Sequence, residues 1–93
     1  MTNLVKSGAR SVEKYEPVEL ECGVSVEFQK VSDGENREIR GEAKKNGKEM
    51  GRISYITISG HFFMNVNMES LGAADAKVVA DCLYNGFKEL TEE

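Results

Sequence analysis

The sequence contains no tryptophan, one histidine, one proline and two cysteines, and these scarcities remove several classes of function. His61 alone would have to serve as the base of a nucleophilic site, yet neither Cys22 nor Cys82 lies near it in the chain. Two cysteines and one distant histidine also do not match the spacing of zinc ligands or of a disulfide framework. We therefore expect no catalytic residues and no metal site.

Phosphate-binding loops and membrane-spanning runs are also missing. The glycines occur singly, and none belongs to a glycine-rich loop that leads into a helix and cradles phosphate. No apolar run approaches the roughly 18 residues of a membrane span, and residues 1–6 are too short and polar for a signal peptide. We expect a cytoplasmic protein that is not an enzyme, with no cofactor, no small-molecule substrate and no membrane contact.

The composition is that of one small globular domain. The chain has 93 residues, of which 40% are hydrophobic and 30% charged, and its net charge is −4. A chain of this length supports a single core. The charge is uneven, because residues 30–52 hold seven of the twelve lysines and arginines, intermixed with acidic residues. A basic segment therefore lies inside an acidic protein.

Alternation of hydrophobic and polar residues predicts four β-strands. Residues 18–28 have an apolar side chain at every even position, which is typical of a strand with one buried face. A turn at 32–36 would lead into a second strand with Phe28 opposite Ile39. The second, third and fourth strands are expected at residues 37–45, 48–59 and 62–68.

The turns between the later strands set their expected pairing. Asn46-Gly47 is a strong signal for a two-residue hairpin turn, and it would place Lys44 opposite Glu49 and Ala43 opposite Met50. A second two-residue turn at Gly60-His61 would place Ile53 opposite Met68.

The third predicted strand contains a conflict of phase. Met50 and Ile53 would lie on opposite faces of a regular strand, although both are apolar. We predict a β-bulge at Gly51 that turns both side chains toward the core.

The last segment is a helix at residues 73–90 with a one-sided apolar stripe. Ser70 is the expected N-cap, and Gly86 on the inner side would allow a close approach to the sheet. The predicted fold is therefore α+β: a four-stranded antiparallel β-meander with one C-terminal helix packed on one face (ββββα). Residues 1–16 would be a tail or a short helix, and residues 17–93 the single domain.

Residues 53–68 contain no charged side chain, which is unusual in this chain. One helix covers one face of the sheet, so apolar residues of this segment would lie uncovered on the other face. Either a partner binds there, or the N-terminal segment folds over it, or a bulge turns these residues inward. The candidates for protein contact are Ile56, Ile58, Phe63, Asn65 and Asn67, together with Glu19, Glu21 and Glu27 of the acidic first strand.

These observations favour a small non-catalytic protein-interaction module, an inhibitor or adaptor that binds another protein or a second copy of itself. The alternative is a single-stranded nucleic-acid-binding protein that uses the basic 37–52 hairpin, where cations would track phosphates beside aromatic residues. Its contact candidates are Arg37, Arg40, Lys44, Lys45, Lys48 and Arg52.

Overall fold

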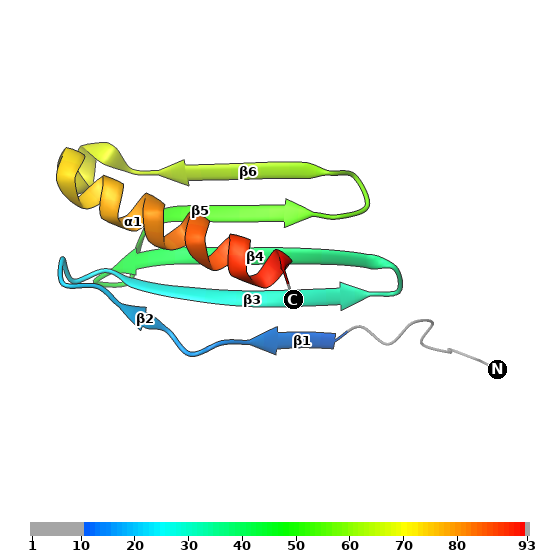
Figure 1. Ribbon diagram of the computed structural model, residues 1–93. Helices are drawn as coiled ribbons and strands as arrows, with labels where there is room; N and C mark the ends of the chain where they lie inside the picture. The colour runs from blue at the N-terminus through cyan, green and yellow to red at the C-terminus, as the bar shows by residue number, and fades with distance from the viewer. Residues whose placement is uncertain (1–10, 93) are drawn as a thin grey trace.

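The computed structural model describes residues 11–92 and shows an antiparallel sheet with one helix packed against one face (Figure 1). The predicted α+β class, a β-meander followed by a C-terminal helix, is confirmed. The elements are β1 (Ser11–Lys14), β2 (Val18–Glu19), β3 (Ser25–Asp33), β4 (Asn36–Lys45), β5 (Lys48–Ile56), β6 (His61–Val66) and α1 (Met68–Thr91). The order across the six-stranded sheet is β1-β3-β4-β5-β6, and β2 also pairs with β3.

The sheet is larger than the predicted four strands because β1 and β2 add an edge beside β3. They follow one another along β3, where Val12 pairs with Val31 and Val18 pairs with Val26. The predicted short helix is therefore wrong for residues 11–14, whereas residues 1–10 lie outside the described part of the chain. Every residue of β1 is exposed, so β1 has no buried face. It is held in place by the pairing of its backbone with β3.

The alternating segment 18–28 is a hairpin and not the single strand predicted. The chain turns at residues 20–23, where the Gly23 N–H donates to the Leu20 carbonyl over 3.0 Å and Gly23 has a φ of +85°. β2 then pairs with the start of β3. The alternation continues through this turn because paired residues of antiparallel strands lie on the same face of the sheet.

The predicted register between β3 and β4 is wrong by two residues. Phe28 pairs with Gly41 and not with Ile39, because the turn consists only of Gly34 and Glu35. β3 consequently continues to Asp33, beyond its predicted end at Phe28, and β4 begins one residue earlier than predicted, at Asn36. An even shift leaves every side chain on its predicted face, so the composition of the core is unaffected.

The hairpin between β4 and β5 has the predicted turn and the predicted bulge. Asn46 and Gly47 both have positive φ, and Lys44 pairs with Glu49 as expected. The register then shifts, so that Ala43 pairs with Gly51 and not with Met50. Met50 is the extra residue, and the bulge leaves both Met50 and Ile53 in the core.

The loop before β6 is longer than predicted, because β5 ends at Ile56 and not at Ser59. The loop spans residues 57–60, and Ile53 pairs with Met64 and not with Met68. The loop is held against β4, where Thr57 N–H donates to the Arg37 carbonyl over 2.9 Å. The strand ends at Val66, which leaves Met68 as the first residue of α1.

The cap of α1 lies earlier than predicted. The Asn67 side chain accepts a hydrogen bond from the Ser70 N–H over 3.0 Å, so Asn67 and not Ser70 is the N-cap. Gly72, with φ 82° and ψ 162°, interrupts the helix after its first turn. This backbone conformation is almost restricted to glycine, and the regular helix resumes at the predicted position 73.

The core lies between α1 and the sheet, as the apolar stripe predicted. Phe28 projects from β3 between two glycines: a Cβ on Gly41 would lie 2.8 Å from its ring, and a Cβ on Gly86 of α1 would lie 2.2 Å from it. The predicted close approach at Gly86 is thus confirmed. The buried core residues are Val24, Val26, Phe28, Ile39, Ala43, Met50, Ile53, Leu71, Ala76, Val79, Leu83 and Leu90.

Candidate interaction surface

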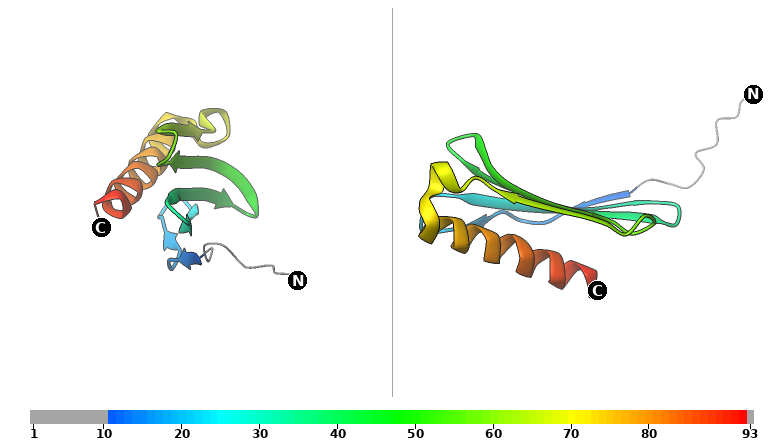
Figure 2. Two further views of the ribbon diagram at one scale, coloured as in Figure 1. Left: turned by 90° about the vertical axis from the view of Figure 1, so that its right-hand side faces the viewer. Right: turned by 90° about the horizontal axis from the view of Figure 1, so that it is seen from above.

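The side of the sheet that faces away from α1 has no helix over it in the part of the chain that the structure describes, and we call it the open face (Figure 2). A hollow of about 610 Å³ lies on this face. Most of the side chains around it are polar or charged: Lys14, Glu27, Gln29, Glu38, Arg40, Glu42, Lys44, Arg52, Ser54 and His61. The aromatic ring of Phe63 also borders it. They come from β1 and from β3 to β6, so the hollow extends across the sheet.

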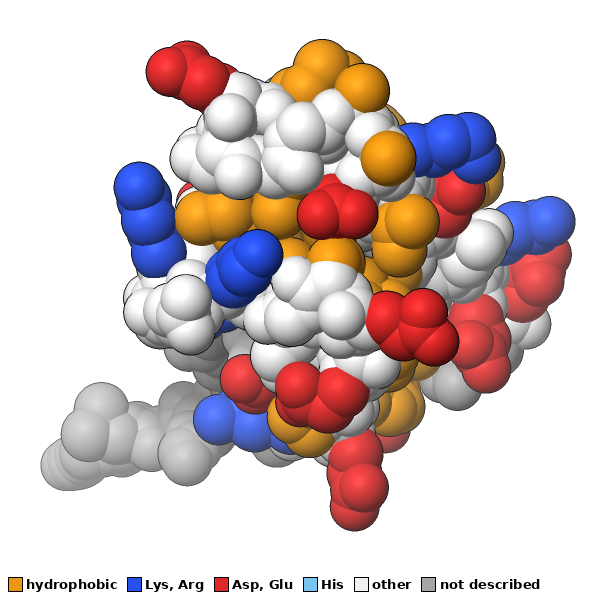
Figure 3. Space-filling view, turned by 90° about the vertical axis from the view of Figure 1, so that its left-hand side faces the viewer, with side chains coloured by type: hydrophobic (Ala, Val, Ile, Leu, Met, Phe, Trp, Pro, Cys, Tyr) orange, Lys and Arg blue, Asp and Glu red, His pale blue; other side chains and the backbone are white. Residues whose placement is uncertain are grey.

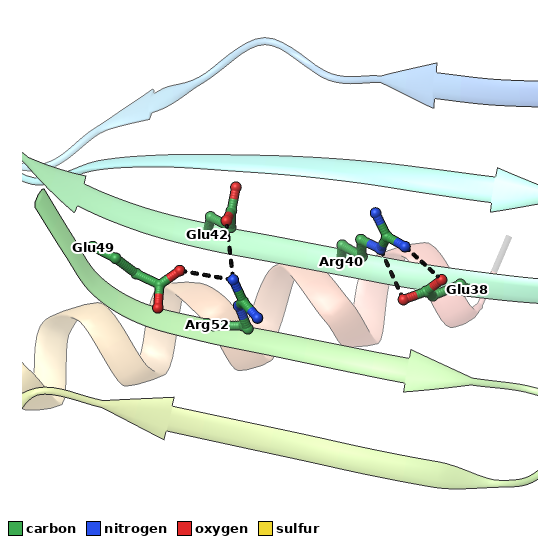
Figure 4. Close-up of polar contacts among 5 residues, drawn as sticks. All are labelled: Glu38, Arg40, Glu42, Glu49 and Arg52. Carbon is green, nitrogen blue, oxygen red and sulfur yellow. Dashed lines mark hydrogen bonds and ion pairs between the residues drawn. The ribbon is translucent and has the colours of Figure 1, made fainter. Parts of the chain in front are cut away.

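Two arginines on the open face are held by neighbouring carboxylates (Figure 4). Arg40 donates through Nε and Nη2 to the two oxygens of Glu38, over 2.7 and 3.0 Å. This hydrogen bond raises the pKa of the Arg40 guanidinium above its usual value. Arg52 Nη2 donates to Glu49 over 3.0 Å and lies 3.5 Å from a Glu42 oxygen. Such exposed pairs add little stability, but they orient the side chains of the face.

The structure does not gather the basic nucleic-acid candidates into one patch. These candidates are Arg37, Arg40, Lys44, Lys45, Lys48 and Arg52. Arg40, Lys44 and Arg52 line the hollow, whereas the other three do not. Arg37 and Lys45 lie near opposite ends of β4, about 27 Å apart at roughly 3.4 Å per residue. The six cations of the basic hairpin therefore do not share one surface.

Three of the five apolar and amide candidates for protein contact lie on the open face. Side chains alternate along β5, so Ile56 lies on the open face, opposite to the core side of Ile53. Phe63 and Asn65 of β6 lie there as well, because they pair with Ser54 and Arg52 of the same face of β5. Phe63 is 45% exposed and borders the hollow. Ile58 lies instead in the loop before β6, 72% exposed, and Asn67 is occupied as the cap of α1.

The three acidic candidates do not form one stripe, because the predicted first strand is a hairpin. Glu19 lies on β2 and accepts a hydrogen bond from the Ser25 hydroxyl over 2.9 Å. Glu21 lies in the turn that follows β2. Glu27 alone borders the hollow, directly opposite Glu42 of β4. Two carboxylates facing each other across a strand pair repel, so this part of the open face favours a cation.

Several residues of the hollow were not predicted from the sequence as contact residues. Glu38 and Glu42 border it, and so do Lys14 and His61. A usable signal exists for two of them, because alternation along residues 37–45 places Glu38, Arg40 and Glu42 on one side of β4. Lys14 and His61 carry no such signal, since their positions depend on the β1 edge and on the length of the loop before β6.

An aromatic cluster lies on the helix side of β6. Phe87 of α1 contacts Tyr55, Phe62 and Tyr84, with ring-centroid distances of 5.5, 5.1 and 5.9 Å. Phe62 and Tyr84 remain 44% and 48% exposed, and Met68 is also exposed, so none of the three belongs to the buried core. At the end of the molecule where α1 begins, hydrophobic side chains reach the upper rim, toward β6, and most carboxylates lie lower (Figure 3).

A smaller hollow of about 330 Å³ lies between α1 and the β1–β2 edge, and Cys82 borders it. Burial raises the pKa of the Cys82 thiol, so this thiol is protonated at neutral pH and is a weak nucleophile. Cys22 and Cys82 are both free thiols.

Within residues 11–92, no three histidine, cysteine or acidic side chains gather closely enough to hold a metal ion. The one described helix is not apolar enough to span a membrane. No protein-family model, no curated protein and no solved structure matches this chain.

Proposed function

We propose that this protein is a non-catalytic protein-interaction module, an inhibitor or adaptor whose contact surface is the open face. The observation that carries the proposal is the composition of the hollow: an exposed aromatic ring, Phe63, stands among four cations and three carboxylates. Aromatic residues and arginine are enriched where proteins bind proteins. A folded partner that offers both signs of charge around an apolar group fits this surface.

The pairing of the arginines supports a protein partner over a nucleic acid. Phosphate contacts supply most of the affinity for nucleic acid, and they need cations that are available to bind. Arg40 and Arg52 already donate to Glu38 and Glu49. Each phosphate brought to this face would also approach carboxylates. A protein surface can instead exchange charge pairs with both the cations and the acids of the hollow.

The proposal is tested by capture of partners from the native lysate with the tagged full chain, with and without nuclease. Arg52→Glu reverses one charge of the hollow, and we expect it to reduce capture of a stoichiometric partner at least about tenfold, because like charges then face each other in the contact. Lys77→Glu is the matched control: Lys77 pairs with Asp81 on α1, away from the open face. This control should capture as much partner as the unmodified chain.

Two outcomes would contradict the proposal. Loss of all captured protein after nuclease treatment, with retention on a nucleic-acid column that disappears when Lys44, Lys45 and Lys48 become glutamate, would favour the nucleic-acid alternative. Equal capture by Arg52→Glu and Lys77→Glu would place the contact away from the open face.

A further inference from the structure

The outer edge of β6 lacks the features that protect sheet edges from pairing. In the described part of the chain β6 pairs only with β5, and it is the last strand of the sheet. Its six residues include no charge and no proline. Natural edges are usually protected by charged residues, proline or bulges. The opposite edge has such protection: β1 and β2 are short, they carry Glu13, Lys14 and Glu19, and Pro17 separates them.

The backbone groups that β6 presents outward can be assigned. The Asn67 N–H donates to the Met50 carbonyl over 2.7 Å, in register with the pairing of β5 and β6. Backbone groups of successive strand residues point to opposite sides, so the odd-numbered residues of β6 bond to β5. The N–H and C=O groups of Phe62, Met64 and Val66 consequently point away from the sheet. β6 therefore offers every second residue, three in all, for pairing with another strand.

The apolar surface next to this edge is incompletely covered. α1 begins beside the end of β6 and runs obliquely toward β3, where Lys30 Nζ donates to the Leu90 carbonyl over 3.5 Å (Figure 1). The helix therefore diverges from the start of β6. At that place Phe62 and Tyr84 are about half exposed around Phe87.

We propose that β6 pairs antiparallel with β6 of a second copy of this chain, about a two-fold axis perpendicular to the sheet. A register centred on Met64 places Phe62 of each copy opposite Val66 of the other. All three outward residues of each strand are then paired, which forms about six backbone hydrogen bonds. The uncharged strand meets itself without repulsion between like charges.

Side-chain placement identifies a second copy as the occupant. The two-fold axis keeps both helices on the same side of the sheet, and it sets the start of β6 in one copy beside the end of β6 in the other. The exposed aromatic rings Phe62 and Tyr84 then approach the beginning of the other helix, where Met68 is 59% exposed and Ala73 and Ala74 are exposed. Each copy supplies both halves of this contact, so the patch is buried twice.

This pairing is independent of the proposed partner contact, because it uses the strand edge and the helix side of the sheet. It also has a consequence for the open face. The two-fold axis leaves both open faces on the same side of one continuous sheet, so a dimer would present two hollows to a partner. Two linked sites bind a divalent partner more tightly than one site does.

The test is hydrogen exchange of the full chain at several protein concentrations, with the mass measured in parallel by sedimentation. We expect a dimer in which the amides of Phe62, Met64 and Val66 are protected, and these amides should lose protection as dilution dissociates it. The Asn65 amide, which points toward β5, is the internal control and should stay protected throughout. A monomer at every concentration, or a dimer in which the three outward amides exchange freely, would overturn the proposal.

A charged variant tests the same edge without touching the open face. Phe62→Lys places a charge in the paired strand, and we expect the dimer dissociation constant to rise about 100-fold or more because that charge would be desolvated. Ile58→Lys, in the loop before β6, is the matched control and should leave the dissociation constant unchanged. A folded Phe62→Lys variant, verified by circular dichroism, that dimerises as well as the unmodified chain would contradict the pairing.

Discussion

Substitution of Gly86 by valine is expected to lower the free energy of unfolding by about 3 kcal/mol, near the upper end of the range for overpacked cores. A Cβ at this position would lie 2.2 Å from the Phe28 ring. The ring cannot retreat toward the sheet, because Gly41 lies against its other side at a distance that also excludes a Cβ. Helix propensity changes little between glycine and valine, so the clash decides the sign.

Asn85→Val is the control, since the neighbouring position 85 is exposed. It should cost less than about 0.5 kcal/mol in urea denaturation. A second arm combines Gly86→Val with Phe28→Ala, which removes the ring that valine would meet. The two substitutions should cost less together than the sum of their separate costs, because they act on the same contact. Strict additivity would show that Gly86 and Phe28 do not pack as described.

Substitution of Ile53 by alanine is expected to cost about 2–5 kcal/mol, the usual range for a large buried side chain. Ile53 is completely buried between β4, β6 and α1, and it lies opposite Met64. A domain of this size has a total stability of about 5–15 kcal/mol, so the variant would be close to unfolding. The midpoint of urea denaturation, with an unchanged slope, measures this loss.

Ile58→Ala removes the same atoms from the same uncharged segment and should change stability by less than about 0.5 kcal/mol. Ile58 is 72% exposed in the loop before β6. This pair of variants separates the part of residues 53–68 that builds the core from the part that does not. Equal losses from the two substitutions would contradict the assignment of their positions.

The faces of the strands could be predicted from the sequence, whereas their exact pairing could not. Phe28 and Ile39 lie on the same face, as alternation indicates, but they are not partners. Hydrophobic pattern distinguishes shifts by one residue, since these expose a buried set, and it does not distinguish shifts by two. The length of a turn decides between the remaining registers. Asn46-Gly47 specified its turn, while the segment 32–36 allowed several.

The β1 strand was missed for a different physical reason. Its four residues are all exposed, so no alternation of buried and exposed positions marks them. Backbone pairing with β3 holds them, and that pairing depends on a neighbour distant in sequence. The bulge at Met50 could be foreseen because two apolar residues conflicted in phase around a glycine, and that conflict is local.

The open face could be predicted only in part. Alternation identifies the side of β4 that carries Glu38, Arg40 and Glu42. The pairing of Arg52 with Glu42 and Glu49 depends on the bulge and on the register across β4 and β5. The sequence does not show this pairing, and from the sequence alone these arginines were candidates for binding phosphate. The sequence already favoured a protein partner, and the pairing of Arg40 and Arg52 with neighbouring carboxylates adds a structural reason for that preference.

The proposal that the open face is a protein-binding surface is tested most directly by mapping amide chemical shifts while the captured partner is added to the full chain. We expect the largest changes around the hollow, at residues such as Glu42, Arg52 and Phe63, with little change along the outer side of α1. Changes confined to α1 or to the β1–β2 edge would contradict the account, and so would a surface that responds only to nucleic acid.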